Sequence, residues 1–137
     1  ELSSFIDDRY FKRGRQIVKE GAIILDKINS ERIEAYAIGT SIYQVNLFRS
    51  LHSKQIMGTC NCPAFLDFGP CKHIAAAGLA YLQAGYKPNE ECYERIDALK
   101  KTLQFLHQQP KQELINIIMD CVAQNEDLLY LIQSKTF

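Results

Sequence analysis

Three cysteines and one histidine lie close together in the sequence, as Cys60-Asn61-Cys62, a loop from Pro63 to Pro70, and Cys71-Lys72-His73. This is the pattern C-x-C-x8-C-x-H. Three thiolates and one imidazole are a ligand set of structural Zn²⁺ centres, which are tetrahedral and keep no coordination position for water or substrate. The spacing therefore predicts one structural zinc ion bound by Cys60, Cys62, Cys71 and His73.

Two other interpretations of these residues compete with zinc binding. They could be ordinary buried cysteines beside a core histidine, but four good ligands in two tight pairs favour a metal. They could form a redox dithiol, but that chemistry usually uses C-x-x-C near a βαβ pattern, and neither feature is present. The remaining two of the five cysteines, Cys92 and Cys121, stand apart in helical patterns and are expected to be small buried apolar residues without a chemical role. The odd number and the clustering argue against a secreted disulfide framework.

The elements that must position the cysteines are predicted by residue patterns upstream. Ser4 and Asp7 resemble a capping box, which predicts a helix from Ser4 to Glu20. Gly14 lies within this helix and marks either a break or a close contact. Alternating apolar and polar residues then predict an antiparallel β-meander, with a polar turn around residues 52–54 and strands at Ala22–Ile28, Arg32–Ile38, Ile42–Arg49 and Gln55–Cys60.

Both ligand pairs have a structural reason for facing one ion. Residues i and i+2 of an extended segment point to the same side, so Cys60 and Cys62 can face the metal where the last strand ends before Pro63. The period of the apolar residues from Ile74 to Leu82 predicts a helix that ends at Gly85. Cys71 and His73 then lie at its N-terminus, where the helix dipole favours a thiolate.

The composition of the chain changes after the predicted zinc-binding segment and the helix that follows it. Residues 86–91 are a polar boundary, which predicts a division into residues 1–87 and a helical appendage at 88–137. Apolar stripes within the appendage predict three helices separated near Pro110 and Asn125, with stripe residues that include Leu99, Leu103, Leu114, Ile118, Leu128 and Ile132. We expect these stripes to be core, or in part a docking face for a partner. The fold class is therefore α+β: an N-terminal helix, a β-meander leading into a zinc-held strand–loop–helix finger, and an all-helical appendage.

The ligand pattern resembles the SWIM zinc finger, a family named for bacterial Swi/Snf-type ATPases and plant Mutator-type transposases. The similarity extends over roughly Tyr10 to Leu82 and includes Arg13-Gly14-Arg15, Gly21-Ala22-Ile23, residues 35–40 and Tyr43-Gln44-Val45. The resemblance implies a ββα-like unit with structural zinc on the four predicted ligands. It also implies binding to DNA or to proteins, and an origin in a larger helicase-like ATPase. The absence of an initial Met agrees with the expectation of a longer parent chain.

Basic residues concentrate near the N-terminus. The formal net charge is zero, so any attraction to nucleic acid must be local. Between residues 9 and 19 every charged residue is basic, and Tyr10 and Phe11 interleave with them, so this stretch could bind phosphates. The alternative is a solvated face balanced by neighbouring acidic residues. The candidate nucleic-acid contacts are Arg9, Lys12, Arg13, Arg15, Lys19, Lys54 and Lys72.

The sequence offers no pattern typical of an enzyme. It contains no nucleophile–base pair, phosphate-binding glycine loop or paired carboxylates, and a zinc ion with four protein ligands is a poor Lewis acid.

We expect a binding module: a zinc-stabilised DNA- or nucleic-acid-binding accessory region of a Swi/Snf-type ATPase. The second hypothesis is a protein-interaction module that docks to a partner or to the motor of the same chain. Without a signal peptide or a membrane-spanning run, a soluble cytoplasmic location with no membrane partner is expected.

Overall fold

The computed structural model describes residues 6–50 and 55–136 of the 137-residue chain. Its elements follow the order α1 (Asp8–Lys19), β1 (Ile23–Ile28), β2 (Arg32–Ile38), β3 (Ile42–Arg49), β4 (Ile56–Cys60), α2 (Pro63–Phe68), α3 (Lys72–Leu82), α4 (Glu90–His107), α5 (Lys111–Gln124) and α6 (Asp127–Thr136). This is the predicted α+β fold, with a helix before an antiparallel sheet, the Cys/His cluster after the strands, and helices at the end. No described helix has the length and apolar character needed to span a bilayer.

The chain forms two compact units, Glu1–Ile96 and Asp97–Phe137. The division falls inside α4, because Cys92 and Ile96 on its first turns are buried in the first unit. The predicted division between residues 87 and 88 stays a prediction.

The four strands form an antiparallel sheet in the order β1-β2-β3-β4, as a meander requires. Cross-strand pairs place Ala35 opposite Val45, and Val45 opposite Cys60. Alternation along each strand turns Ala35, Ala37, Val45 and Leu47 inward, and all four are buried. The sheet therefore carries the first zinc-ligand candidate directly beside the core. The polar turn predicted around residues 52–54 lies outside the described residues.

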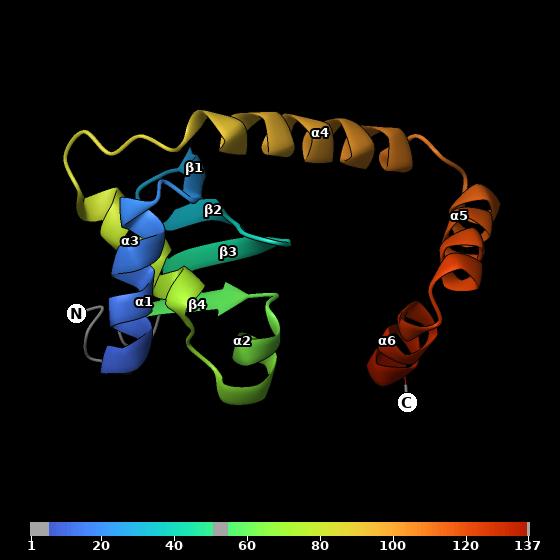
Figure 1. Ribbon diagram of the computed structural model, residues 1–137, viewed down its shortest axis with the longest axis horizontal. Coiled ribbons are helices and arrows are strands. Elements are labelled where there is room, and N and C mark those ends of the chain that lie inside the picture. Colours follow the sequence, from blue (N-terminus) through green and yellow to red (C-terminus); the bar gives the residue numbers. More distant parts are fainter. Residues whose placement is uncertain (1–5, 51–54, 137) are drawn as a thin grey trace. The chain divides into compact units, whose positions relative to one another are not determined.

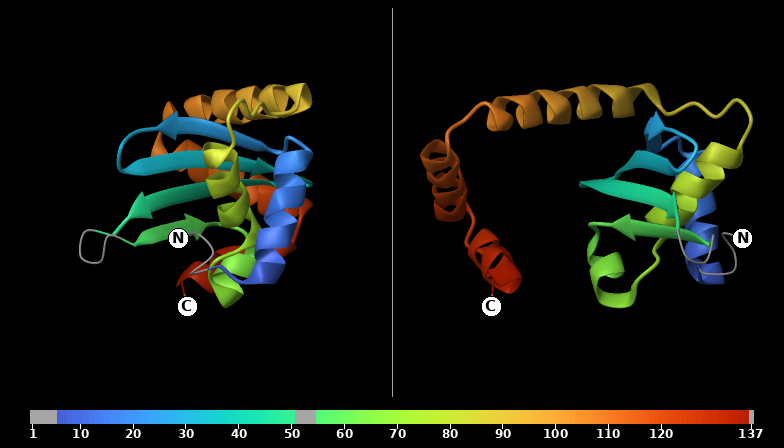
Figure 2. Two further views of the ribbon diagram at one scale, coloured as in Figure 1. Left: turned by 90° about the vertical axis from the view of Figure 1, so that its left-hand side faces the viewer. Right: turned by 180° about the vertical axis from the view of Figure 1, so that it is seen from behind.

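Helices α1 and α3 cover one face of the sheet in the first unit (Figures 1 and 2). α3 contacts all four strands and α1 packs on α3. The small residues Ala75, Ala76, Ala77 and Ala80 are almost fully buried and let the helix approach its neighbours closely. Ile74 fills the space above the sheet with no exposed surface.

Gly14 marks the close contact that its position in a helix suggested. A Cβ atom built there would lie 2.8 Å from Ala75 Cβ and 2.9 Å from Ala76 N. No side chain fits at that distance, so the glycine at position 14 allows α1 to approach α3 closely. The helix is not broken at this residue.

Two predictions about local structure were wrong. The first helix begins at Asp8 instead of Ser4, because the Asp7 side chain accepts the Arg9 N–H and caps the helix; Ser4 lies outside the described residues. The stretch from Pro63 to Pro70, predicted as a loop, contains the short helix α2. Pro63 has a backbone conformation suited to a first helical turn, and the Cys62 thiol accepts the Phe65 N–H at 3.4 Å.

The second unit is all helical, as expected, but it has no buried interior. Among residues 97–135 no side chain is buried, although the predicted stripe residues Leu99, Leu103, Leu114 and Leu128 are half-buried. Ile118, Met119 and Leu131 are about half exposed. The expectation that these stripes form a core is therefore not met within this unit.

Candidate metal centre

A strand end, a short helix and a helix start bring the four ligand candidates together. Cys60 is the last residue of β4, and Cys62 caps the N-terminus of α2. Cys71 is the N-cap of α3, and His73 lies in the first turn of that helix. All four are buried, with His73 the most exposed at 9%. These three elements therefore meet at one point of the core.

The geometry of the cluster fits a tetrahedral ion. One ligand atom from each residue can be chosen so that all four lie within 4.8 Å of one another. The His73 Nδ1 atom is 3.8 Å from both the Cys60 Sγ and the Cys71 Sγ. With Zn–S near 2.3 Å and Zn–N near 2.0–2.1 Å, the sulfur–nitrogen edge of a tetrahedron is about 3.6 Å. Cys60, Cys62, Cys71 and His73 therefore fit one structural zinc ion.

The electrostatics of the thiols agree with a site that needs a cation. The thiol of Cys60, followed by the His73 imidazole, lowers the pKa of Cys71 to about 4. The same contact with Cys71, together with burial, raises the pKa of Cys60, and burial raises the pKa of Cys62. A bound divalent cation would release the thiol protons, because metal-bound cysteine is a thiolate.

Two residues to which the sequence assigned no role at the metal centre lie beside the ligands. Asn61 accepts the Gln44 N–H on its side chain at 2.9 Å and donates its own N–H to the Gln44 carbonyl at 3.4 Å. The Tyr43 ring lies over the His73 ring, with centroids 5.0 Å apart. Asn61 fixes the turn between Cys60 and Cys62, and Tyr43 orients the imidazole. Only its place between two ligands could have drawn attention to Asn61.

A family model matches the segment of the chain that contains this cluster. The family model described as SWIM zinc finger matches residues 43–82. The match runs from Tyr43 to the end of α3 and contains all four ligand candidates. No similar curated protein and no similar solved structure was found. The family match and the buried cluster together support a zinc-binding module in this part of the chain.

The two other cysteines are not members of the cluster. The Cys92 thiol is buried and donates to the Gly21 carbonyl at 3.5 Å, and burial raises its pKa. This agrees with the expected small core residue. Cys121 is exposed, so it does not have the predicted burial.

The structure gives the candidate nucleic-acid contacts different environments. Arg9, Lys12, Arg13, Arg15 and Lys19 are all exposed on α1. Arg9 is paired with Asp7 through an Nε–Oδ1 contact of 3.2 Å, whereas Lys72 is half-buried at the start of α3. Lys54 lies outside the described residues. The α1 residues therefore share one helix, whereas Lys72 lies on α3 between Cys71 and His73.

Proposed function

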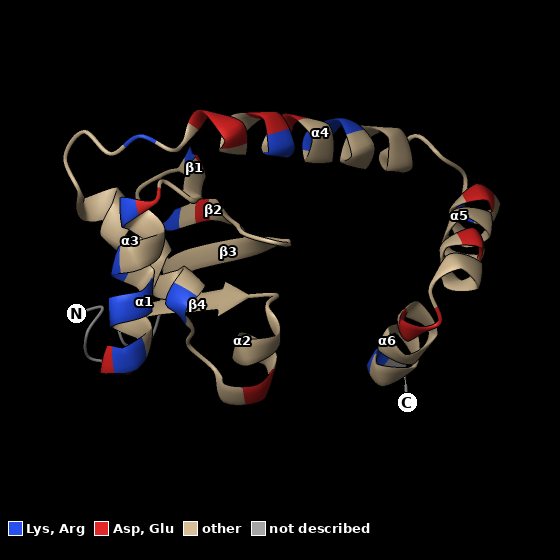
Figure 3. Cartoon of the chain, viewed as in Figure 1, with Lys and Arg blue, Asp and Glu red and all other residues tan. Residues whose placement is uncertain are grey.

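We propose that this chain is a zinc-stabilised nucleic-acid-binding module, with DNA as the preferred class of partner. The observation that carries the proposal is the exposed basic surface of α1, which we call the α1 basic face and define as Lys12, Arg13, Arg15 and Lys19. Figure 3 colours Lys and Arg blue along this helix. Lysine and arginine side chains on one helix provide the phosphate contacts that dominate nucleic-acid affinity.

The charges of this face are available for phosphate. Its four residues form no ion pair with any residue in the described ranges 6–50 and 55–136. Arg9 is excluded from the face because its guanidinium already contacts the Asp7 carboxylate, which also lowers the pKa of Asp7. The zinc cluster contributes no attraction, since Zn²⁺ with three thiolates and a neutral imidazole carries a formal charge of about −1.

The metal centre would hold the α1 basic face in position through helix α3. Zinc would fix the first turn of α3 to the end of β4, and α1 packs along α3 with Gly14 against Ala75. The phosphate-binding charges then stand on a helix whose position depends on the cluster. In this proposal zinc acts through structure, and the chain catalyses no reaction.

The place of the module in a larger protein is also part of the proposal. An accessory role in a Swi/Snf-type, helicase-like ATPase rests on the resemblance of the finger to that family. A motor that moves along DNA would gain affinity from a contact surface that tolerates any sequence, because phosphates carry no sequence information.

A second candidate function is protein interaction. The observation that favours it is the set of exposed apolar side chains between residues 97 and 135, among them Ile118, Met119, Tyr130 and Leu131. Exposed apolar patches of this kind mark interaction surfaces in soluble proteins. This function would leave the α1 basic face without a role.

Salt-titrated binding to fluorescent DNA tests the first function against the second. We expect binding at low salt that falls steeply with salt. A Lys12→Glu, Arg13→Glu double variant should flatten the slope of log K against log salt by about 0.9 for each duplex phosphate that the variant no longer neutralises. The matched control is Lys101→Glu with Lys111→Glu, which makes the same change in charge on exposed residues of the second unit. Absence of binding at low salt, or equal weakening in both variants, contradicts nucleic-acid binding by this face.

A further inference from the structure

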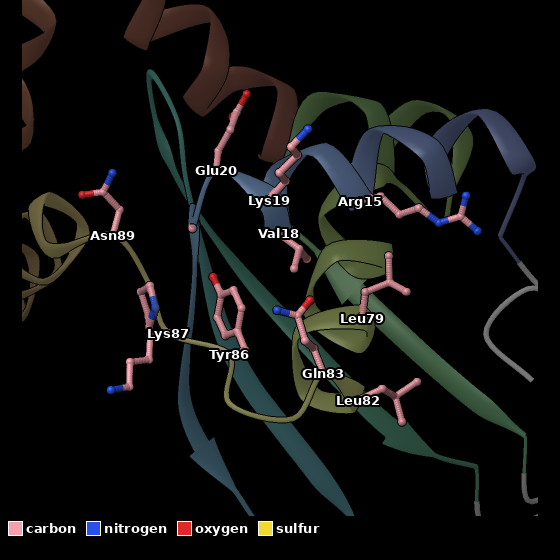
Figure 4. A pocket seen from close by; sticks show the side chains of 12 residues that line it. Arg15, Val18, Lys19, Glu20, Leu79, Leu82, Gln83, Tyr86, Lys87 and Asn89 are labelled. Carbon is pink, nitrogen blue, oxygen red and sulfur yellow. The ribbon is translucent and has the colours of Figure 1, made fainter.

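A pocket of about 770 Å³ opens beside the C-terminal end of α1 (Figure 4). The C-terminal turns of α1 and α3 and the segment that joins α3 to α4 form its walls. Ligand pockets in proteins are typically about 300–1,000 Å³, so the space is large enough for a nucleotide. The pocket lies entirely within the first unit and is separate from the metal cluster.

Part of the pocket lining is apolar and includes one aromatic ring. Val18 and Leu79 line it together with Leu82, which is 69% exposed, and the Tyr86 ring. Tyr86 is fixed by its hydroxyl, which donates to the Ile23 carbonyl at 2.6 Å and accepts the Ile23 N–H at 3.2 Å. The polar end of Tyr86 is therefore satisfied by the protein, and its ring remains as a flat apolar surface.

The rim of the pocket is cationic. Figure 4 shows the charged ends of Arg15, Lys19 and Lys87 reaching outward at different sides of the pocket. The acidic member of the lining is Glu20, whose carboxylate accepts the Gln16 side-chain amide at 2.9 Å. The Arg15 guanidinium lies 5.4 Å from the centroid of the Phe11 ring, which supports it from one side. Three cations against one carboxylate favour an anionic ligand.

We propose that this pocket binds one unstacked nucleotide of a single-stranded nucleic acid. The base would lie on the Tyr86, Leu79 and Leu82 surface, and its flanking phosphates would contact Arg15, Lys19 and Lys87. The Gln83 amide at the same wall can donate to and accept from a base edge. Aromatic and apolar platforms combined with a basic groove are the means by which proteins bind single strands without sequence preference.

This inference rests on the proposed function and makes it more specific. Arg15 and Lys19 belong both to the α1 basic face and to the pocket rim, and they lie one helical turn apart. A backbone that follows α1 thus reaches the pocket without leaving the basic surface. A duplex cannot fill the pocket in this way, because its bases are paired and stacked inside the helix.

Leu82→Asp is the variant that tests the pocket, and Leu66→Asp is its matched control. Both residues are apolar and strongly exposed, at 69% and 66%, so neither replacement empties the core, and Leu66 lies on α2 outside the pocket. The probes are a fluorescent oligothymidylate of about twelve nucleotides, within the range of single-strand binding sites, and a duplex of similar length. Circular dichroism of each variant checks that the fold is kept.

We expect the wild-type chain to bind the single strand more tightly than the duplex. Leu82→Asp should weaken single-strand binding about tenfold, the effect expected for loss of one stacked base, and Leu66→Asp should change it less than about twofold. Equal effects of the two variants, or a preference for duplex, overturn the pocket assignment while leaving nucleic-acid binding intact. Failure to bind either probe at low salt overturns both proposals, and so does capture of an acidic peptide in the pocket in place of the oligonucleotide.

Discussion

The two compact units differ in what holds them together. In the first, a sheet, two covering helices and a buried Cys/His cluster converge on side chains with almost no exposed surface, such as Ile23 and Ile74. In the second, no residue from 97 to 135 is buried. Its last two helices have 14 and 10 residues, and isolated helices shorter than about 12–15 residues are marginal in water. Stability in the first unit thus comes from packing and metal ligation, and in the second from local hydrogen bonds within helices.

The local bonds of the second unit are visible in its side chains. Thr102 donates to the Ala98 carbonyl at 2.8 Å, and the Gln112 amide donates to the Asn116 side chain at 3.2 Å. Asn125 accepts the Asp127 N–H just before α6. Each contact joins residues two to four positions apart, so none depends on the first unit. Perturbations of the metal centre should therefore leave this unit unchanged.

Removal of zinc should have the largest effect and should separate the units most clearly. Structural zinc binds finger peptides with about 10–16 kcal/mol at neutral pH, comparable with the whole stability of a domain. A strong chelator should abolish hydrogen-exchange protection in β4, α3 and α1 while exchange in α5 and α6 stays the same. Acid should have a similar effect, because cysteine binds zinc as a thiolate and protons compete with the ion for the sulfur. Unchanged protection in α3 after complete removal of metal contradicts this prediction.

Truncation of one isoleucine in each unit should have very different costs. Ile74→Ala removes a side chain with no exposed surface and should lower the free energy of unfolding of the first unit by about 2–5 kcal/mol. Ile118, which is 47% exposed on α5, is the matched residue, and Ile118→Ala should change stability by less than about 0.5 kcal/mol. Urea unfolding followed by tyrosine fluorescence measures both. Similar costs would mean that the exposed stripe is packed in solution.

Gly14→Ala should destabilise the contact between α1 and α3. On an exposed helix this replacement stabilises by about 1 kcal/mol, but here the new Cβ would lie 2.8 Å from Ala75 Cβ. We expect a net destabilisation of about 1–3 kcal/mol from overpacking, seen in the urea midpoint. Gln16→Ala, at an exposed position of the same helix, is the control. A Gly14→Ala chain that is more stable than wild type would show that the two helices are not in close contact.

Tyr86→Phe should destabilise the first unit by about as much as Gly14→Ala, and the effect should depend on pH. It removes two hydrogen bonds to Ile23, each with a net contribution of about 0.5–1.5 kcal/mol. Burial raises the pKa of Tyr86 above its usual value, so the folded state favours the neutral phenol. This contribution is present below the unfolded pKa and is lost as pH rises through the folded pKa. The difference between wild type and Tyr86→Phe should therefore shrink in strongly alkaline solution, and a constant difference would refute the assignment.

Much of the first unit could be predicted because its signals are local. Period-two alternation located the strands within one residue at each end, and the C-x-C and C-x-H pairs identified the cluster that the structure brings together. The start of α1 was predicted wrongly because Ser4 and Asp7 are both good caps, and α2 was missed because its cap is a thiol, Cys62. The sequence left a helix break and a close contact open for Gly14; the structure shows the close contact, and Ala75 as its partner follows only from the three-dimensional packing.

For the second unit, the sequence predicted the helices but not whether their apolar stripes are buried. Its helices follow from the spacing of residues such as Leu99 and Leu103, yet the same spacing cannot say whether a stripe meets another surface. Burial depends on residues distant in sequence, so the expected core was not found there. The pocket beside Tyr86 was equally inaccessible to prediction, because its walls come from α1, α3 and the segment after α3.

The most direct test of the central claim is the metal content and coordination of the purified chain. Elemental analysis should find one zinc ion per chain, and X-ray absorption at the zinc edge should fit three sulfur neighbours near 2.3 Å and one nitrogen near 2.0–2.1 Å. Cys62→Ser and His73→Ala should abolish this signal, and Cys121→Ser, on an exposed cysteine outside the cluster, should leave it unchanged. A wild-type chain that is well folded and free of metal would contradict the account.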